Sequence, residues 1–248
     1  MLGIIGGTGL TQLSNLEVTH KQVVRTPYGE PSGALVFGRI GGREVVFLPR
    51  HGHGHTIPPH MVNYRANIWA LDSQSVDSVV SVASVGGIRA DLGPGVIAVP
   101  DQIIDYTWGR RSTFHEGDDR AVVHIDFTRP YCDRMRRRIL KAAEAASQAV
   151  VVGGVYAATQ GPRLETAAEI DRLERDGAHM VGMTGMPEAG LAREMGLCYA
   201  TIAVVANHAA GRGQSRESIR MEDINATLRT ALTQVRGIIE KLVETRAS

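Results

Sequence analysis

A pair of polar residues that could bind a heterocyclic ligand follows a long apolar run late in the chain. Residues 199–206 are apolar except for one Thr, are rich in Val, Ile and Ala, and lead directly into Asn207 and His208. Such a run predicts a strand buried on both faces, as in parallel α/β sheets. Ligands of open α/β sheets bind just beyond the carboxyl ends of the strands, and an amide both donates and accepts hydrogen bonds. Asn207 is therefore a candidate binding residue; the alternative is an Asn that only caps a turn.

The glycine-rich start of the chain could bind a small anion. Residues 2–10 combine a short strand pattern with a glycine turn that has Thr8 at its tip. Such a turn exposes backbone N–H groups to phosphate, and the hydroxyl adds a donor. A dinucleotide site is not favoured, because Gln12 stands where the third glycine of that motif belongs. The alternative is a tight turn that needs only the backbone freedom of glycine.

The stretch PRHGHGH at 49–55 supports two interpretations. Alternating His51, His53 and His55 could be metal ligands in a metal-dependent hydrolase. However, the segment has no nearby carboxylate, and its glycines make a poor ligand frame. Arg50 and His51 could instead bind an oxyanion, because the guanidinium fork suits phosphate. The anion site is favoured, since a second phosphate-type turn already exists at the N-terminus.

One carboxylate, Glu165, lies in the loop TQGPRLET at 159–166, between a predicted strand and a predicted helix. At a helix N-terminus, a carboxylate is stabilised by the helix dipole. From its position alone, Glu165 is better interpreted as such a terminal residue than as a recognition group.

The elements that must position these residues alternate between strands and helices. The patterns predict a hairpin at 35–40 and 44–48, further strands at 76–85, 95–104, 150–158 and 179–184, and helices at 60–72, 130–147, 187–195 and 221–245. Residues 106–126 are polar and irregular, which indicates an excursion over the surface. The alternation predicts one α/β domain over residues 1–248.

Composition excludes several classes of function. The formal net charge is +1 and charged residues make up 21% of the chain, so there is no electrostatic case for nucleic acid or a membrane surface. No span of about 20 apolar residues is present, and the chain begins with a strand pattern rather than a signal peptide. Cys132 and Cys198 are far apart in sequence, so reduced thiols in a cytoplasmic protein are expected.

Six segments taken together resemble the trimeric purine nucleoside phosphorylase and methylthioadenosine phosphorylase family. They are GIIGGTGL, RHGHGHTIPPHMVNYRANIWAL, SVGGI, QGPRLET, MTGMPEAGLAREMGLCYA and VVANHAA, in this order over residues 3–211. The resemblance implies a central mixed sheet surrounded by helices and a homotrimer. It also implies phosphorolysis of a purine nucleoside without a metal or organic cofactor, with inorganic phosphate as co-substrate.

The resemblance also implies roles for individual residues. The implied phosphate site consists of Thr8, Arg50, His51, Ala83 and Thr184, with Ser84 beside it. The implied nucleoside site consists of Met183 beneath the ribose, Leu164 at the base, Asn207 at N7 and the 6-substituent, Glu165 at N1, and His124 reaching a neighbouring subunit's site. Among these, Asn207, Glu165 and His51 are the expected catalytic residues.

Departures from the adenine-preferring members of the family predict the base. Those members carry acidic residues in place of Asn207 and Ala209, and Ser in place of Glu165. Members that cleave inosine and guanosine carry Asn and Glu, as this chain does. A 6-oxopurine presents O6 as an acceptor and N1–H as a donor, which suits an amide and a carboxylate. Adenine reverses both roles, because its 6-amino group donates and its N1 accepts. Each buried mispaired polar group costs about 1–3 kcal/mol.

The sugar is predicted by Met221, which occupies the position where inosine-cleaving relatives place a His near the 5′-hydroxyl. A thioether packs well against a methylthio group and cannot donate a hydrogen bond; a shifted gap would instead place Ile219 or Arg220 there. The expected substrate is 5′-methylthioinosine. The alternatives are a phosphorylase for methylthioadenosine or for inosine and guanosine, the metal-dependent hydrolase, and a purine-binding protein without catalysis.

Overall fold

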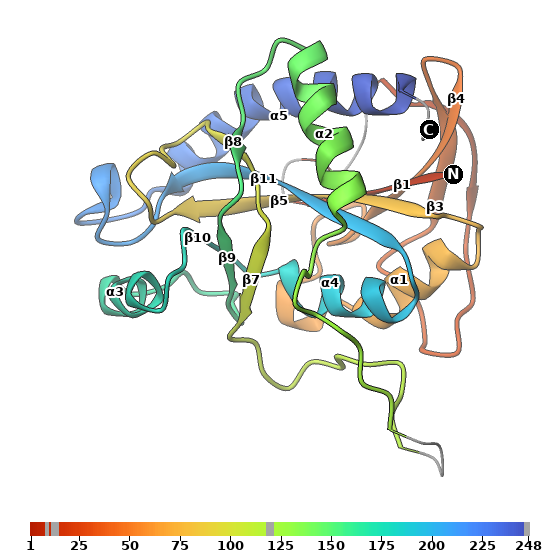
Figure 1. Cartoon of the computed structure of the whole chain (residues 1–248), viewed down its shortest axis with the longest axis horizontal. Coiled ribbons are helices and arrows are strands. Elements are labelled where there is room, and N and C mark those ends of the chain that lie inside the picture. Colours follow the sequence, from red (N-terminus) through yellow and green to blue (C-terminus); the bar gives the residue numbers. More distant parts are fainter. Residues whose placement is uncertain (8–9, 11–14, 118–121, 246–248) are drawn as a thin grey trace.

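A mixed β-sheet with helices on both faces forms the centre of the protein (Figure 1). The structure is a computed structural model that describes residues 1–7, 10, 15–117 and 122–245. In these residues the strands are β1 (Leu2–Gly6), β2 (Glu17–Gln22), β3 (Leu35–Ile40), β4 (Arg43–Pro49), β5 (Ser78–Gly87), β6 (Ile97–Val99), β7 (Gln102–Asp105), β8 (Val151–Val152), β9 (Val155–Ala158), β10 (Met180–Gly182) and β11 (Cys198–His208).

The long strands β5 and β11 lie side by side at the middle of the sheet. They are parallel, and the register joins Cys198 to Ser78 at one end and His208 to Gly87 at the other. On its other edge β5 pairs with parallel β1 and antiparallel β10, and β1 pairs with parallel β4. The first nine residues of β11 are buried, which confirms the buried strand predicted at 199–206. Asn207 follows near the carboxyl end of this strand.

Helices cover the two faces of the sheet. On one face, α2 (Asp133–Ala145) and α5 (Met221–Glu244) pack into a shared apolar cluster with β1, β4 and β11. On the other face, α1 (Tyr64–Asp72) and α4 (Gly185–Glu194) form a second cluster, while α3 (Ala167–Arg175) packs beside β9 and β10. This arrangement confirms the predicted α/β fold with a central mixed sheet. Within the described part of the chain, none of the helices is both long and apolar enough to cross a membrane.

Several element boundaries differ from the sequence predictions. The strand predicted at 95–104 is two strands, β6 and β7, separated at Pro100, which lacks the N–H that a continuous ladder needs. The strand predicted at 150–158 is interrupted at Gly153 and Gly154, whose φ angles are 83° and 117°. Helix α1 begins only after the N-cap Asn63, whose side chain accepts a hydrogen bond from a backbone N–H.

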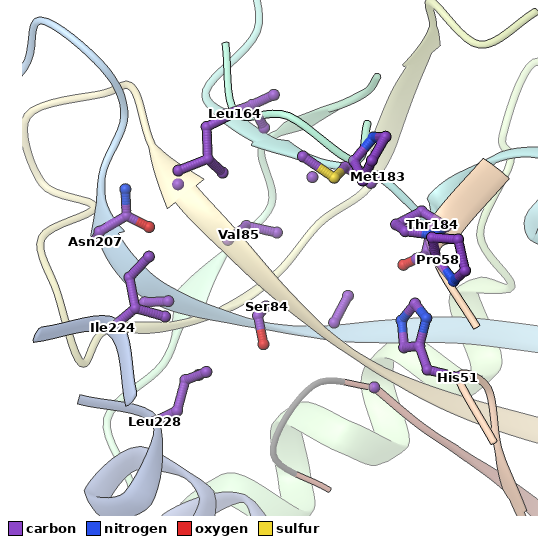
Figure 2. A pocket seen from close by; sticks show the side chains of 18 of the residues that line it. His51, Pro58, Ser84, Val85, Leu164, Met183, Thr184, Asn207, Ile224 and Leu228 are labelled. Atoms are coloured by element: carbon purple, nitrogen blue, oxygen red, sulfur yellow. The ribbon is translucent and has the colours of Figure 1, made fainter. Parts of the chain in front are cut away.

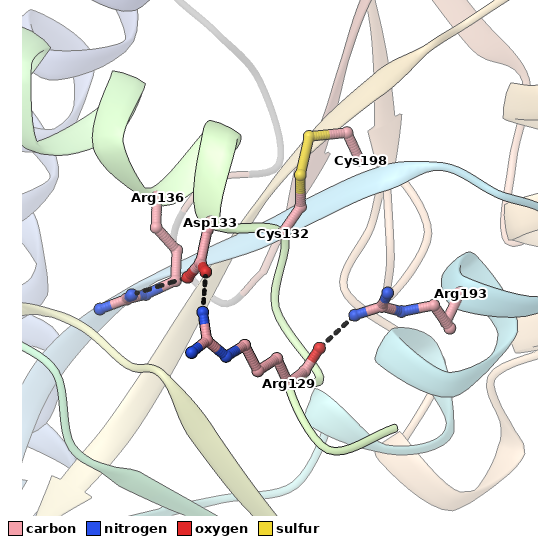
Figure 3. The surroundings of a disulfide bond; sticks show 6 residues. All are labelled: Arg129, Cys132, Asp133, Arg136, Arg193 and Cys198. Atoms are coloured by element: carbon pink, nitrogen blue, oxygen red, sulfur yellow. Dashed lines mark hydrogen bonds and ion pairs between the residues drawn. A yellow bond between two sulfur atoms is a disulfide. The ribbon is translucent and has the colours of Figure 1, made fainter. Parts of the chain in front are cut away.

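Two features were not predicted. Strand β2 has six exposed residues and therefore carries no buried–exposed alternation. The prediction of reduced thiols is wrong, because Cys132 and Cys198 form a disulfide with a Cα–Cα distance of 5.2 Å (Figure 3). The two residues are 66 positions apart, but the chain entering α2 runs beside the start of β11, where the Cys132 N–H donates to the Tyr199 carbonyl. Separation in sequence concealed this contact.

Candidate active site

A cavity of about 520 Å³ opens where the carboxyl ends of the parallel strands meet. Its walls come from Gly7 after β1, Arg50 and His51 after β4, residues 83–86 of β5, and Ala206, Asn207, Ala209 and Ala210 at and just beyond the end of β11. This is where ligands bind in open α/β sheets. Figure 2 shows Asn207 and His51 on opposite sides of the cavity.

The cavity contains most of the residues expected to bind phosphate. Its lining includes Arg50, His51, Ala83, Ser84 and Thr184. Thr8, also expected there, lies outside the described residues. Ala83 and Ser84 come from β5, and Thr184 immediately precedes α4. The structure therefore brings together residues that are up to 134 positions apart in sequence, from Arg50 to Thr184.

Arg50 is fixed by a buried hydrogen-bond network that the sequence did not reveal. Its Nε and Nη2 donate to the two carboxylate oxygens of Glu188, at 2.6 and 2.8 Å. Nη2 also donates to Ser81 Oγ at 2.5 Å, and Nη1 donates to the Val82 carbonyl at 3.0 Å. The hydroxyls of Ser81 and Tyr199 each donate to Glu188 Oε1 at 2.8 Å. Four of the five guanidinium hydrogens are thus engaged behind the cavity wall.

The ion pair keeps both partners charged although both are buried. Burial acts to raise the pKa of Glu188, but Arg50 and the two hydroxyls hold it below its ordinary value. Burial acts to lower the pKa of Arg50, and Glu188 more than offsets this. The Arg50 guanidinium packs against the glycine-rich turn: a Cβ at Gly7 would lie 2.9 Å from Nη1 and 2.5 Å from the Val82 carbonyl oxygen. Glycine is therefore required at position 7 for this close approach.

His51 is buried and neutral. Its Nδ1 lies 2.8 Å from the Ile57 carbonyl oxygen, and because a carbonyl only accepts, Nδ1 carries the hydrogen and Nε2 is an acceptor. Burial, assisted by the positive charge of Arg50, lowers the pKa of His51 to about 4. His51 therefore holds a neutral imidazole against the cavity at physiological pH.

The histidine-rich stretch does not assemble a metal-ligand set. The His51 and His55 rings lie 4.7 Å apart and both residues line the cavity, whereas His53 packs beside Gly33. In the described ranges, no group of three His, Cys, Asp or Glu side chains is placed to hold a metal ion. Arg50 and His51, the two residues of the oxyanion interpretation, both line the cavity.

A β-bulge turns Asn207 toward the cavity. The register of β11 against β5 shifts between Val205 and Asn207, and such bulges re-aim side chains. Asn207 Nδ2 donates to the His208 carbonyl at 2.6 Å. One amide hydrogen and the carbonyl oxygen therefore remain for a ligand. Ala209, with 2% exposure, lines the same region.

Glu165 is not the cap of the following helix. That function belongs to a capping box in which Thr166 and Glu169 each accept a backbone hydrogen bond from the other residue. Glu165 instead lines the cavity with Leu164 and Met183. Burial raises the pKa of the Glu165 carboxyl, while a 2.6 Å hydrogen bond from Thr159 Oγ1 to Oε1 opposes this effect.

An apolar wall from the start of α5 completes the cavity. Ile219 and Met221 both line it, whereas Arg220, the third candidate for this position, is exposed and pairs with Asp223. Met221 is 60% exposed. Sequence analysis missed two further lining residues, Ile224 and Leu228. The signal is present in the apolar stripe of α5, a pattern typical of core packing, whose first two turns face the cavity in this protein.

His124 lies apart from this cavity. It is exposed on the irregular excursion and is absent from the lining. Its expected contact with a neighbouring subunit's site stays a prediction.

Comparisons with known proteins agree on one family. The family model for the phosphorylase superfamily matches residues 1–244. A probable S-methyl-5′-thioinosine phosphorylase of Pseudomonas syringae pv. tomato is 51% identical over 240 residues, covering 97% of each chain. A 6-oxopurine nucleoside phosphorylase of Pyrococcus furiosus is 44% identical, over 85% of this chain and 80% of the other. Among solved structures, methylthioadenosine phosphorylase from Schistosoma mansoni in complex with adenine superposes with a TM-score of 0.93 at 34% identity, over 98% of this chain and 90% of the other.

Proposed function

The chain belongs to the phosphorylase superfamily, and from this premise we propose that it catalyses the phosphorolysis of 5′-methylthioinosine to hypoxanthine and 5-methylthioribose 1-phosphate. The reaction is a pentosyl transfer. The observation that carries the proposal is that the Glu165 carboxylate and the Asn207 amide line one cavity, whose α5 wall is apolar.

The base preference follows from the hydrogen-bonding capacity left at these two residues. Glu165 Oε2 remains an acceptor for N1–H, and the second Asn207 amide hydrogen can be donated to O6. A 6-aminopurine offers an N1 lone pair and an amino group, so both contacts would be mispaired. Two such mispairings correspond to a discrimination of about 10²-fold or more. The relatives named for methylthioinosine and for 6-oxopurine nucleosides support the same preference.

The sugar preference follows from the apolar wall. Ile219, Met221, Ile224 and Leu228 bring no charged group to the cavity. A 5′-methylthio group buries its apolar surface there, whereas a 5′-hydroxyl would lose hydrogen bonds to water. The solved relative named for methylthioadenosine supports a 5′-methylthio sugar, and Met183 is proposed to pack beneath the ribose.

The proposed mechanism relies on positioning and electrostatics. Phosphate, held by Arg50, His51, Thr184 and the backbone at residues 83–84, with Thr8 expected to join them, attacks C1′ as the C1′–N9 bond breaks. The dianion stabilises the oxocarbenium character of the sugar. The bonding electron pair leaves with the purine, which gains a proton at N7, and hydrogen phosphate loses one proton as its oxygen forms the bond to C1′, so that exchange with solvent balances the two. Asn207 Oδ1 is free to accept a hydrogen bond from that N7–H. No metal or organic cofactor is assigned a role.

We further propose the cellular setting and assembly. The enzyme would act in purine and methylthio-nucleoside salvage in the cytoplasm as a homotrimer, with His124 reaching a neighbouring subunit's site. Sedimentation equilibrium tests the assembly, and a His124→Ala variant tests the contribution of one subunit to the next.

Initial rates test the function directly. Methylthioinosine, methylthioadenosine and inosine are each assayed with and without phosphate, and with a chelator. We expect phosphate-dependent cleavage of methylthioinosine well above that of the other two nucleosides. A preference for methylthioadenosine would overturn the assignment of the base edge but not the phosphorylase activity. Turnover that needs no phosphate and is abolished by the chelator would overturn the phosphorylase and favour the hydrolase.

A further inference from the structure

Thr159 lies behind Glu165 on the loop that follows β9. Its Oγ1 is 2.6 Å from Glu165 Oε1 and 3.3 Å from the Gly182 carbonyl oxygen. A hydroxyl has one hydrogen to donate. The Gly182 carbonyl already accepts the Thr159 backbone N–H at 2.8 Å, so the shorter contact identifies Glu165 as the acceptor of the hydroxyl hydrogen.

The backbone of Thr159 is held from a second direction by Arg110. This guanidinium donates to the Thr159 and Gln160 carbonyls at 3.2 and 2.8 Å, and to the Met183 carbonyl at 2.8 Å. It therefore joins the Glu165 loop to the segment that lines the cavity beside Thr184. With its amide and its carbonyl both bonded, Thr159 has little freedom to move its hydroxyl away from Glu165.

The effect of this contact depends on which form of Glu165 it favours. A hydrogen bond donated to a charged group is stronger than one between neutral groups. The Thr159 hydroxyl therefore favours the carboxylate over the carboxylic acid. It also occupies Oε1, which leaves Oε2 as the acceptor proposed for N1–H.

Other charged groups near Glu165 are already paired among themselves. Arg163 binds Glu169 through two contacts of 2.8 and 2.7 Å. On the side away from the main cavity, Tyr106 donates to Asp176, and Arg172 lies over the Tyr106 ring. Asn207 and Met183 on the cavity side are neutral. Burial raises the pKa of Glu165 and the Glu169 charge adds to this, while the Thr159 hydroxyl, the backbone N–H of Glu165 itself and the Arg163 charge oppose it.

We propose that Thr159 is a specificity-determining positioning residue: its hydroxyl presents Glu165 as an acceptor and so selects nucleosides whose N1 carries a hydrogen. The inference rests on the proposed function, because it concerns how the same site chooses its base. Without the hydroxyl, the carboxylate of Glu165 loses a stabilising hydrogen bond, so the carboxylic acid form becomes more abundant at a given pH. Protonated Glu165 can donate to the N1 lone pair of a 6-aminopurine, so the selection against adenine nucleosides weakens.

The test compares Thr159→Val, which keeps the shape and loses the hydroxyl, with Thr159→Ser, which keeps the hydroxyl. For each enzyme, kcat/KM is measured with methylthioinosine and methylthioadenosine between pH 5.5 and 8.5. We expect the ratio of the two values to fall about tenfold in Thr159→Val at the acidic end of this range, because a charged hydrogen bond is lost. The deficit should shrink as the pH rises, because higher pH favours the carboxylate of Glu165 in all three enzymes. Thr159→Ser should follow the wild type, and KM for phosphate should be unchanged in both variants.

The pH dependence separates this role from general damage to the site, which would lower both rates at every pH. A Thr159→Val ratio that matches the wild type at all pH values would overturn the inference, as would a Thr159→Ser variant as altered as Thr159→Val. Thr159→Ala, which also lacks the hydroxyl, replaces Thr159→Val if the latter does not fold. Absence of phosphate-dependent cleavage by the wild type would instead overturn the proposed function, and this inference with it.

Discussion

The lowered pKa of His51 keeps its imidazole neutral and reduces the free energy of unfolding at acidic pH. Its Nδ1–H is committed to the Ile57 carbonyl, and its pKa is lowered from 6.5 to about 4 by burial and by Arg50. The unfolded chain therefore binds a proton at His51 between pH 6.5 and 4, whereas the folded chain does not. Stability consequently rises with pH through this window and levels off above 6.5. The folded enzyme is thereby supplied with a neutral imidazole whose Nε2 can accept a hydrogen bond from a phosphate hydroxyl.

This protonation state predicts a pH-dependent difference between the wild type and His51→Asn, whose amide can still donate to the Ile57 carbonyl but cannot titrate. From pH 7.5 to 4.5 the wild type should lose about 2–3 kcal/mol of unfolding free energy more than the variant does. Urea unfolding at the two pH values measures the difference. Equal losses in the two proteins would mean that His51 is not held in its neutral form.

At the residue scale, the sequence predicted which residue types gather in the cavity but not how each is held. Asn207 and Arg50 could be singled out because they stand directly after buried strands. From position alone, Glu165 is expected to act at the helix terminus rather than in recognition, and this expectation is wrong because Thr166 and Glu169 form the cap. The Thr159 contact depends on a loop path that no local pattern specifies.

At the scale of elements, Glu188 joins four of them through one carboxylate. It lies on α4 and binds Arg50 after β4, Ser81 on β5 and Tyr199 on β11. The buried pair is costly to desolvate, but removing one partner leaves the other charge buried without compensation. Helix α4 therefore does more than cover the sheet: it fixes the guanidinium at the end of the cavity that we propose binds phosphate.

A double-mutant cycle tests this coupling. Glu188→Leu and Arg50→Met should each cost about 3–5 kcal/mol of unfolding free energy, and the double variant should cost much less than their sum. Urea unfolding of the four proteins gives the coupling energy. The exposed pair Arg39–Glu44, with a 3.8 Å contact, is the matched control and should show a coupling of about 1 kcal/mol or less. Additive costs at Arg50 and Glu188 would contradict the network.

Element types were predictable from sequence because the patterns are strong. The hairpin at β3 and β4, the buried β11 and the long helix α5 all appear where expected. Glu188 was not singled out, since a Glu one turn into a helix is ordinary on a solvent-exposed face. Its burial depends on α4 lying across three strands that are distant in sequence.

At the scale of the whole molecule, the Cys132–Cys198 disulfide ties the entry of α2 to the start of β11. It lies at the opposite end of β11 from Asn207. Between the two ends, β11 is paired with β5 along its length and with β6 in its middle. This pairing holds Asn207 in place independently of the covalent link.

The link should therefore support stability without setting activity. Cross-linking residues 66 positions apart restricts the unfolded chain, and a disulfide of this kind contributes about 2–4 kcal/mol. Wild-type protein treated with dithiothreitol should unfold at a lower urea concentration than the oxidised wild type. The Cys132→Ser/Cys198→Ser variant should do the same, with or without dithiothreitol. Their kcat/KM for methylthioinosine should match that of the oxidised wild type below the transition.

Thiol titration completes the test, because the two cysteines should react only after reduction. Two reactive thiols in the untreated folded protein, together with unfolding that is insensitive to dithiothreitol, would contradict the disulfide. That result would instead support the predicted reduced thiols, the state that cytoplasmic proteins usually maintain. A fall in kcat/KM of the Cys132→Ser/Cys198→Ser variant, with its stability retained, would instead show that strain at the start of β11 reaches Asn207 through the sheet. In that case the paired strands would transmit a displacement over the length of β11 rather than absorb it.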